Sequence, residues 1–187
     1  FAGGVLREGT RFWSEGMEGP RERKIGGKTA EEWRDLGYHE KDPEKRVRYY
    51  SFALQIDPRN PLAWYQQGLA LQRLGRLKEA ASSFGKVLEM DGRHSGAWFS
   101  LGQVQRDPKE YEKAVGTFDE LLGREPGHTG ALEARGHALL ELKRPGDALE
   151  TFDRLLALDA GRAGAWYARG IALIDLARPA GALGSRS

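Results

Sequence analysis

Few side chains in the sequence combine the residue types and the spacing that catalysis or ligand chemistry requires. Gly27-Lys28-Thr29 matches the end of a phosphate-binding loop, but that motif needs a glycine five residues before its last glycine, where Glu22 stands. Thr29 followed three residues later by Glu32 instead predicts a capping box at the start of a helix. The chain contains no cysteine, which excludes disulfides, thiolate metal sites and cysteine nucleophiles.

The histidines and carboxylates also lack the spacing of a metal site or a catalytic site. His94 and His128 are 34 residues apart rather than four apart on one helix face, so we expect them in solvated turns. Acidic residues such as Glu150 and Asp153 lie among lysines and arginines, as on an ordinary helix surface. No combination of serine, histidine and acid matches a catalytic motif. The sequence therefore predicts that the protein is not an enzyme and holds neither a metal nor a cofactor.

Composition excludes several further classes of protein. The 29 Lys and Arg residues against 27 Asp and Glu residues leave a net charge of +2, without the clustered basic excess of a nucleic-acid-binding surface. Hydrophobic residues make up 40% of the chain and include five tryptophans, too many for a disordered chain. No apolar run approaches the roughly 18 residues of a membrane span, and no signal peptide opens the sequence. We expect a cytoplasmic protein with no nucleic-acid partner and no membrane partner.

The sequence repeats itself with a period of 34 residues, and several kinds of residue keep that period independently. Four columns carry it: Trp64, Trp98, Leu132 and Trp166; Gly68, Gly102, Gly136 and Gly170; Ala80, Ala114, Ala148 and Ala182; Phe84, Phe118 and Phe152.

Each repeat has the pattern of two helices joined by a turn. Ala80, Phe84 and Val87 recur at intervals of three and four residues, which predicts one face of a helix. Glycine and proline interrupt the pattern within and between units, so we expect turns there between antiparallel helices. We expect Gly68 and Ala80 at the crossing of the two helices, and the aromatic residues in the space between one hairpin and the next.

These columns resemble the tetratricopeptide repeat, a family with a 34-residue unit. The resemblance runs from residue 29 to residue 187 and includes a shortened first unit with Trp33-Arg34-Asp35-Leu36-Gly37. It implies an all-α fold, a right-handed superhelical solenoid of antiparallel helix hairpins with about four full units and a truncated fifth. The units are expected at about 29–60, 61–94, 95–128, 129–162 and 163–187. Residues 1–28 are expected to be a linker or a degenerate repeat, and the truncated last unit indicates a piece of a longer protein.

One column departs from the family pattern at the position before the glycine. Gln67, Arg135 and Arg169 stand where the family prefers leucine, which Leu101 retains. We expect this change to leave the fold intact and to alter the pitch of the superhelix.

The resemblance also implies a concave groove lined mainly by the first helix of each hairpin. Tyr65, Phe99 and Tyr167 are the favoured groove aromatics, and Arg34 with Tyr38 extends the groove toward the N-terminus. For Leu69, Leu140 and Ile171, packing within the hairpin is the alternative, and Ile174 has a contact with a continuing chain as its alternative. Carried over by register, the groove residues are Tyr65, Leu69, Gln72, Arg73, Phe99, Gln103, Arg106, Glu133, His137, Leu140, Glu141, Tyr167, Ile171 and Ile174.

The predicted function is a non-catalytic protein–protein interaction scaffold that binds an extended or helical peptide segment of a partner in this groove. The alternative is a regulatory or substrate-recruiting arm of a larger enzyme whose catalytic domain lies outside this chain. Some family members bind a C-terminal carboxylate through lysine and asparagine, but Tyr65 and Leu69, or Arg34 and Tyr38, occupy the corresponding positions. We therefore expect a different ligand. Self-association through the open C-terminal end is a further expectation.

Overall fold

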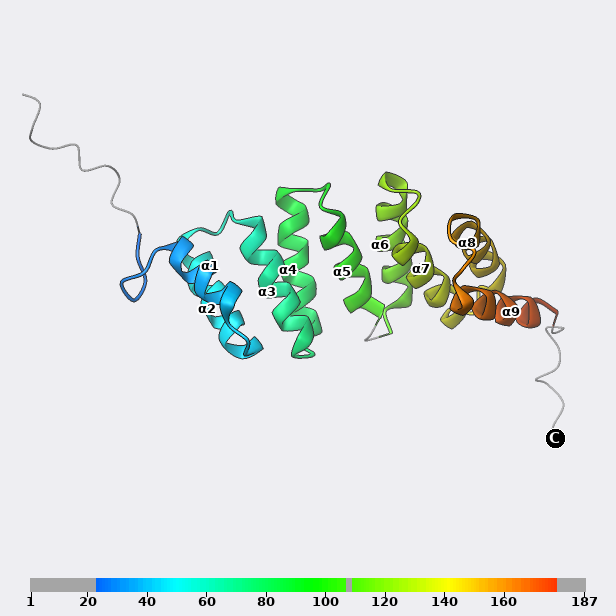
Figure 1. Cartoon of the computed structure of the whole chain (residues 1–187), viewed down its shortest axis with the longest axis horizontal. Coiled ribbons are helices and arrows are strands. Elements are labelled where there is room, and N and C mark those ends of the chain that lie inside the picture. The colour runs from blue at the N-terminus through cyan, green and yellow to red at the C-terminus, as the bar shows by residue number, and fades with distance from the viewer. Residues whose placement is uncertain (1–22, 107–108, 178–187) are drawn as a thin grey trace, which may run out of the picture.

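The computed structural model describes residues 23–106 and 109–177, and the described residues form helical hairpins stacked in a row. Figure 1 shows the hairpins following one another along the long axis, from α1 and α2 at one end to α9 at the other. Outside the helices, the described part has one isolated β-bridge, between Ile25 and Lys28. The helices are α1 (Ala30–His39), α2 (Pro43–Ile56), α3 (Pro61–Arg73), α4 (Leu77–Met90), α5 (Ser95–Arg106), α6 (Tyr111–Arg124), α7 (Thr129–Glu141), α8 (Pro145–Leu158) and α9 (Ala163–Ala177).

The helix cap expected at Thr29 is confirmed. The Thr29 hydroxyl accepts from the Glu32 amide at 3.2 Å, while a Glu32 carboxylate oxygen accepts from the Thr29 amide at 2.7 Å. Asn60 caps α3 by accepting from the amide of Ala63 at 3.0 Å, with Pro61 as the first helical residue. Polar cap residues satisfy amides that have no partner within the helix, and they therefore help to fix where α1 and α3 begin.

The expectation that His94 and His128 lie in solvated turns is wrong. Nδ1 of His94 accepts from the amide of Ala97 at 3.0 Å, and Nδ1 of His128 accepts from the amide of Ala131 at the same distance. Both side chains are half-buried. Each histidine thus acts as the N-terminal cap of the helix that follows it.

The repeated glycines make room for an aromatic ring of the same hairpin. A Cβ built on Gly68 would lie 2.6 Å from Phe84, and one built on Gly102 would lie 2.5 Å from Phe118. The same relationship joins Gly136 to the Phe152 ring. The neighbour that requires glycine at this position is therefore the Phe84 ring, while the crossing of the two helices at Gly68 and Ala80 stays a prediction. The aromatic column fills each hairpin rather than only the space between hairpins.

Three tryptophans bond the first helix of their unit to the turn before it. Nε1 of Trp64 donates to the carbonyl of Pro58, and Nε1 of Trp98 donates to that of Gly92, both at 2.9 Å. Trp166 makes the equivalent bond to Ala160 at 2.9 Å. The deepest core is formed instead by small and large apolar residues in alternation, fully buried at Ala63, Phe84, Val87, Ala97, Phe118, Ala131, Leu132, Leu139, Phe152, Leu155 and Ala165. Stacking thus buries faces that no single hairpin could bury.

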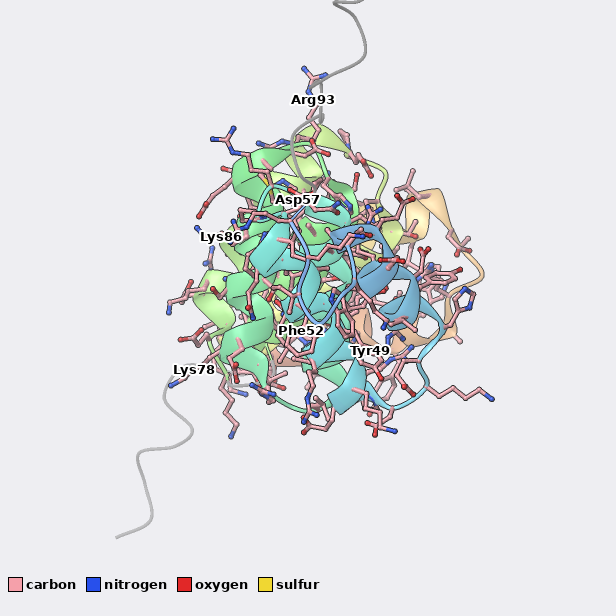
Figure 2. The ribbon with its side chains drawn as sticks, turned by 90° about the vertical axis from the view of Figure 1, so that its left-hand side faces the viewer. Tyr49, Phe52, Asp57, Lys78, Lys86 and Arg93 are labelled. Atoms are coloured by element: carbon pink, nitrogen blue, oxygen red, sulfur yellow. The ribbon has the colours of Figure 1, made fainter. Side chains whose placement is uncertain are left out.

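The two ends of the described array differ. At the N-terminal end, Trp33 packs against Tyr49 and Phe52 of α2, with ring centroids 5.5 and 4.7 Å away, and Figure 2 shows these two α2 side chains from that end. At the other end, Leu173 of α9 is 42% exposed, whereas its equivalent Leu139 is fully buried. No described helix follows α9 to cover that face. The expectations for residues 1–22 and for the second half of the fifth unit lie outside the described residues.

Candidate functional site

The odd-numbered helices form one side of the array. Besides the contacts between neighbours in sequence, α3 packs directly against α5, α5 against α7, and α7 against α9. Helices α5, α7 and α9 hold a buried small residue at one repeat position, namely Ser100, Ala134 and Ala168. The odd-numbered helices therefore present one continuous surface. Figure 2 shows Lys78 and Lys86 of α4 projecting on the side away from α1.

Two adjoining hollows lie across the middle of the array. The first, of about 380 Å³, is lined by Gln72 of α3, by Gln103 and Arg106 of α5, and by Tyr111 at the start of α6. The second, of about 330 Å³, shares Arg106 and Tyr111 and adds two residues of α7. Because they share two walls, we treat them as one feature, the central trough, lined by Gln72, Gln103, Arg106, Tyr111, His137 and Glu141.

The central trough carries charges that the rest of the fold does not neutralise. Arg106 and Glu141 form no ion pair with another residue in the described ranges. The ring of His137 packs edge-on against Phe152, with centroids 5.4 Å apart. Burial, followed by the positive charge of Arg106, lowers the pKa of His137, while Glu133 and Glu141 act in the opposite direction. A neutral imidazole can both donate and accept a hydrogen bond at neutral pH.

The structure brings together five of the groove residues expected from the sequence, namely Gln72, Gln103, Arg106, His137 and Glu141. Sequence reasoning missed Tyr111, because it considered only first helices and Tyr111 belongs to a second helix. The sequence did carry a signal for this residue, because Tyr111 is an aromatic directly after the hairpin turn. The residues 34 positions before and after it are Leu77 and Pro145.

Tyr65 and Phe99 each lie against a histidine that caps a following helix. The Tyr65 ring lies 4.8 Å from that of His94, and the Phe99 ring lies 5.3 Å from that of His128. Both aromatic side chains are half-buried. They pack α3 against the capping residue of α5, and α5 against the capping residue of α7. Their part in a peptide-binding groove stays a prediction. In the following unit, Glu133 replaces the aromatic and forms an ion pair with Arg162 at 2.6 Å.

The remaining expected groove residues lie outside the central trough. Leu69 and Leu140 pack against buried core clusters, in keeping with their alternative assignment to hairpin packing. Arg73 is exposed and lines neither hollow. On α9, Ile171 is half-buried, and Tyr167 and Ile174 are 74% and 55% exposed.

The described ranges contain no grouping of three or more histidine or acidic side chains that could hold a metal ion. Among the same residues, no helix combines the length and the apolar character that crossing a membrane requires.

A model of the tetratricopeptide repeat family matches residues 47–88, 65–129 and 133–185, which together make up more than half of the chain. The chain belongs to the tetratricopeptide repeat family. No curated protein matches it.

Solved structures of tetratricopeptide repeat proteins share the fold. A MamA crystal structure has a TM-score of 0.76 and 19% identity, over 79% of this chain and 82% of that one. MamA from Desulfovibrio magneticus RS-1 has a TM-score of 0.72 and 23% identity, over 78% of this chain and 84% of that one. YrrB is described as a tetratricopeptide repeat protein with an unusual peptide-binding site. It has a TM-score of 0.66 and 22% identity, over 78% of this chain and 73% of that one. At these identities the likeness establishes the helical repeat solenoid alone.

Proposed function

We propose that this tetratricopeptide repeat array, over residues 29–187, is a non-catalytic interaction module that binds a peptide segment of another protein in the central trough. The observation that carries the proposal is the continuity of the trough across α3, α5, α6 and α7. The side chains of Gln72, Gln103, Arg106 and Glu141 in its lining form no hydrogen bond or ion pair with another described residue. A surface that spans several repeats can contact several successive residues of one segment.

The lining favours an extended segment over an apolar helix. Gln72 and Gln103 carry amide groups that can both donate to and accept from an extended peptide backbone, whose polar groups have no internal partner. An amphipathic helix would instead need an apolar groove, because its backbone groups are already paired. Arg106 and Glu141 place opposite charges in the trough, which would select the direction and the charge of the bound segment. YrrB, which shares the fold, is described as having a peptide-binding site, and this supports a peptide as the ligand.

The experiment is selection of binding peptides from a displayed random library, followed by fluorescence anisotropy with purified variants. Arg106→Ala and Tyr111→Ala should each lower the affinity for the selected peptide by about tenfold, because each removes a direct contact with the peptide. The control is Lys78→Ala with Lys86→Ala on α4, which should leave affinity unchanged. Equal binding by the trough variants, or a loss caused by the α4 variants, would remove the trough as the binding site. Helical circular dichroism of every variant checks that the array remains folded.

A further inference from the structure

The first helices end on charged residues whose sign changes along the array. Arg73 is the last residue of α3 and Arg106 the last of α5, whereas Glu141 is the last of α7. None of these three side chains forms an ion pair or a hydrogen bond with another described residue. Because α3 packs against α5 and α5 against α7, the ends of these helices carry positive charge first and negative charge after it.

Glu141 stands where its own helix disfavours a carboxylate. The C-terminal end of a helix carries a partial negative charge, so a cation in the last turn stabilises the helix and an anion destabilises it. Arg73 and Arg106 follow this rule, and the last turn of α7 contains no basic residue to offset Glu141. No described side chain forms an ion pair with Glu141 either. A cation supplied by a bound partner would offset this charge.

Arg106 and Glu141 belong to one hollow without pairing with each other. Both line the second hollow of the central trough, together with Tyr111 and His137. Their charges act on the pKa of His137 in opposite directions, since Arg106 lowers it and Glu141 raises it. Two opposite charges that share a hollow and remain unpaired can each receive a group of opposite sign from one ligand.

We propose that the central trough recognises the charge order of its ligand, a segment whose acidic residue contacts Arg106 and whose basic residue contacts Glu141. This inference rests on the proposed function, because it specifies the peptide that the trough binds. Backbone contacts at Gln72 and Gln103 give the segment one direction, so that exchanging its two charges places each beside a charge of the same sign.

The geometry of an extended segment sets the spacing of the two residues. Packed helices such as α5 and α7 lie about 8–10 Å apart. An extended chain advances about 3.3 Å per residue, and every second side chain lies on the same face. We therefore expect the acidic and the basic residue to be two or four positions apart, about 7 or 13 Å along the segment.

The mixed charge of the trough favours such a segment over a ligand of one sign. A nucleic acid or a purely acidic peptide would be attracted by Arg106 but repelled by Glu141 in the same hollow. A purely basic peptide would meet the opposite conflict. A segment with both signs in the matching order avoids both.

The test exchanges the two trough charges while the net charge stays the same. The full chain and its double variant Arg106→Glu with Glu141→Lys are each used to select peptides from a displayed random library. We expect the unmodified chain to enrich acidic and basic residues two or four positions apart, and the double variant to enrich the opposite order. In fluorescence anisotropy, exchanging the two charges of a selected peptide should weaken its binding to the unmodified chain by about tenfold and strengthen its binding to the double variant similarly.

The matched control exchanges an arginine and a glutamate of α8. Glu150→Lys with Arg154→Glu also keeps the net charge, and both residues are exposed and lie outside the trough lining. This control should prefer the same peptide as the unmodified chain. Arg106→Gln with Glu141→Gln is a milder trough variant that should bind both charge orders equally. Melting curves of all variants check that the array remains folded.

The outcomes separate this inference from the proposed function. Equal binding of both charge orders by the unmodified chain, or an unchanged preference in the trough variants, would overturn the charge order. Selected peptides that lack the charge pair but lose affinity in Tyr111→Ala would overturn it as well, while leaving the trough as the peptide site. Failure to enrich any peptide would overturn the proposed function and this inference together.

Discussion

Nε of Arg135 donates to Oδ1 of Asp119 at 2.6 Å, which joins α7 to the second helix of the preceding hairpin. The same guanidinium donates from Nη1 to the hydroxyl of Thr151 in α8. Arg135 thus links three helices across a junction between repeats. Its equivalent Gln67 makes a parallel set, donating to Ser51 of the preceding hairpin at 2.8 Å and accepting from Ser83 of its own at 3.4 Å.

The hydrogen bonds of Arg135 across this junction lead to a prediction about stability. Asp119→Ala should lower the free energy of unfolding by about 0.5–1 kcal/mol, because it leaves the half-buried guanidinium of Arg135 without its acid partner. In an Arg135→Leu background the same change should cost close to nothing, since leucine already stands at this position as Leu101. Urea denaturation of the four variants measures the coupling. Strictly additive effects would show that the pair does not stabilise the junction.

The close contact between the repeated glycine and the aromatic ring predicts that Gly→Ala has opposite effects on stability at positions 102 and 116. Gly102→Ala should destabilise the array by about 1–3 kcal/mol, because the added methyl group would lie 2.5 Å from the Phe118 ring. Gly116→Ala on α6 should stabilise it by up to about 1 kcal/mol, since that position is exposed and has open space around it.

Thermal unfolding monitored by circular dichroism compares these two variants directly. Phe118→Leu should reduce the effect of Gly102→Ala by making room for the methyl group. A tolerated Gly102→Ala would show that the ring does not require glycine.

Because the Trp98 indole donates a hydrogen bond to the turn before its helix, we expect removal of that N–H group to lower the free energy of unfolding. Trp98→Phe keeps an aromatic ring but loses the donation to the Gly92 carbonyl and weakens the contact with the Arg124 guanidinium, 5.0 Å from the ring. We expect a loss of about 1 kcal/mol in the free energy of unfolding. The turn at Gly92 should also exchange its amide hydrogens faster. Unchanged exchange and stability would argue that the indole contributes packing alone.

The central trough predicts a pH effect with a defined sign. The pKa of His137 in the folded state should lie below its ordinary value, chiefly because of burial, and Arg106→Gln should raise it by removing the second cause. The unfolded chain then binds more protons than the folded one, so His137 contributes a loss of stability as pH falls below about 6.5 and through the folded pKa. Heteronuclear titration of the ring measures the pKa, with His137→Gln to assign the signal. A value at or above the ordinary one would contradict this account of the trough.

The period of the sequence was sufficient to predict the hairpins, but not the capping role of His94 and His128 or the orientation of side chains that share a repeat position. Thr29 was predictable as a cap because a capping box needs only local chemistry. Tyr65 and Phe99 share a column with exposed Tyr167, yet they stack on histidines that only the packed neighbour positions. Tyr111 was missed because its part in the trough depends on how one hairpin's turn meets the next first helix.

At the positions that depart from the family pattern, the sequence likewise shows which residue stands there but not what that residue contacts. The sequence alone indicated that Gln67 and Arg135 replace leucine. It did not indicate that each side chain forms hydrogen bonds with the residues sixteen positions before and after it. Arg46 is a further case, since an arginine in place of the repeated alanine was visible in the sequence, while its hydrogen bond to Gln66 was visible only in the structure.

The most direct test of the central claim is site-specific photo-crosslinking of a selected peptide to the full chain. A photoreactive phenylalanine is placed at position 103 in the central trough or at position 86 on α4, and mass spectrometry locates the attached peptide. The account predicts efficient, saturable crosslinking from position 103 and background levels from position 86. Efficient crosslinking from position 86, with none from position 103, would contradict it.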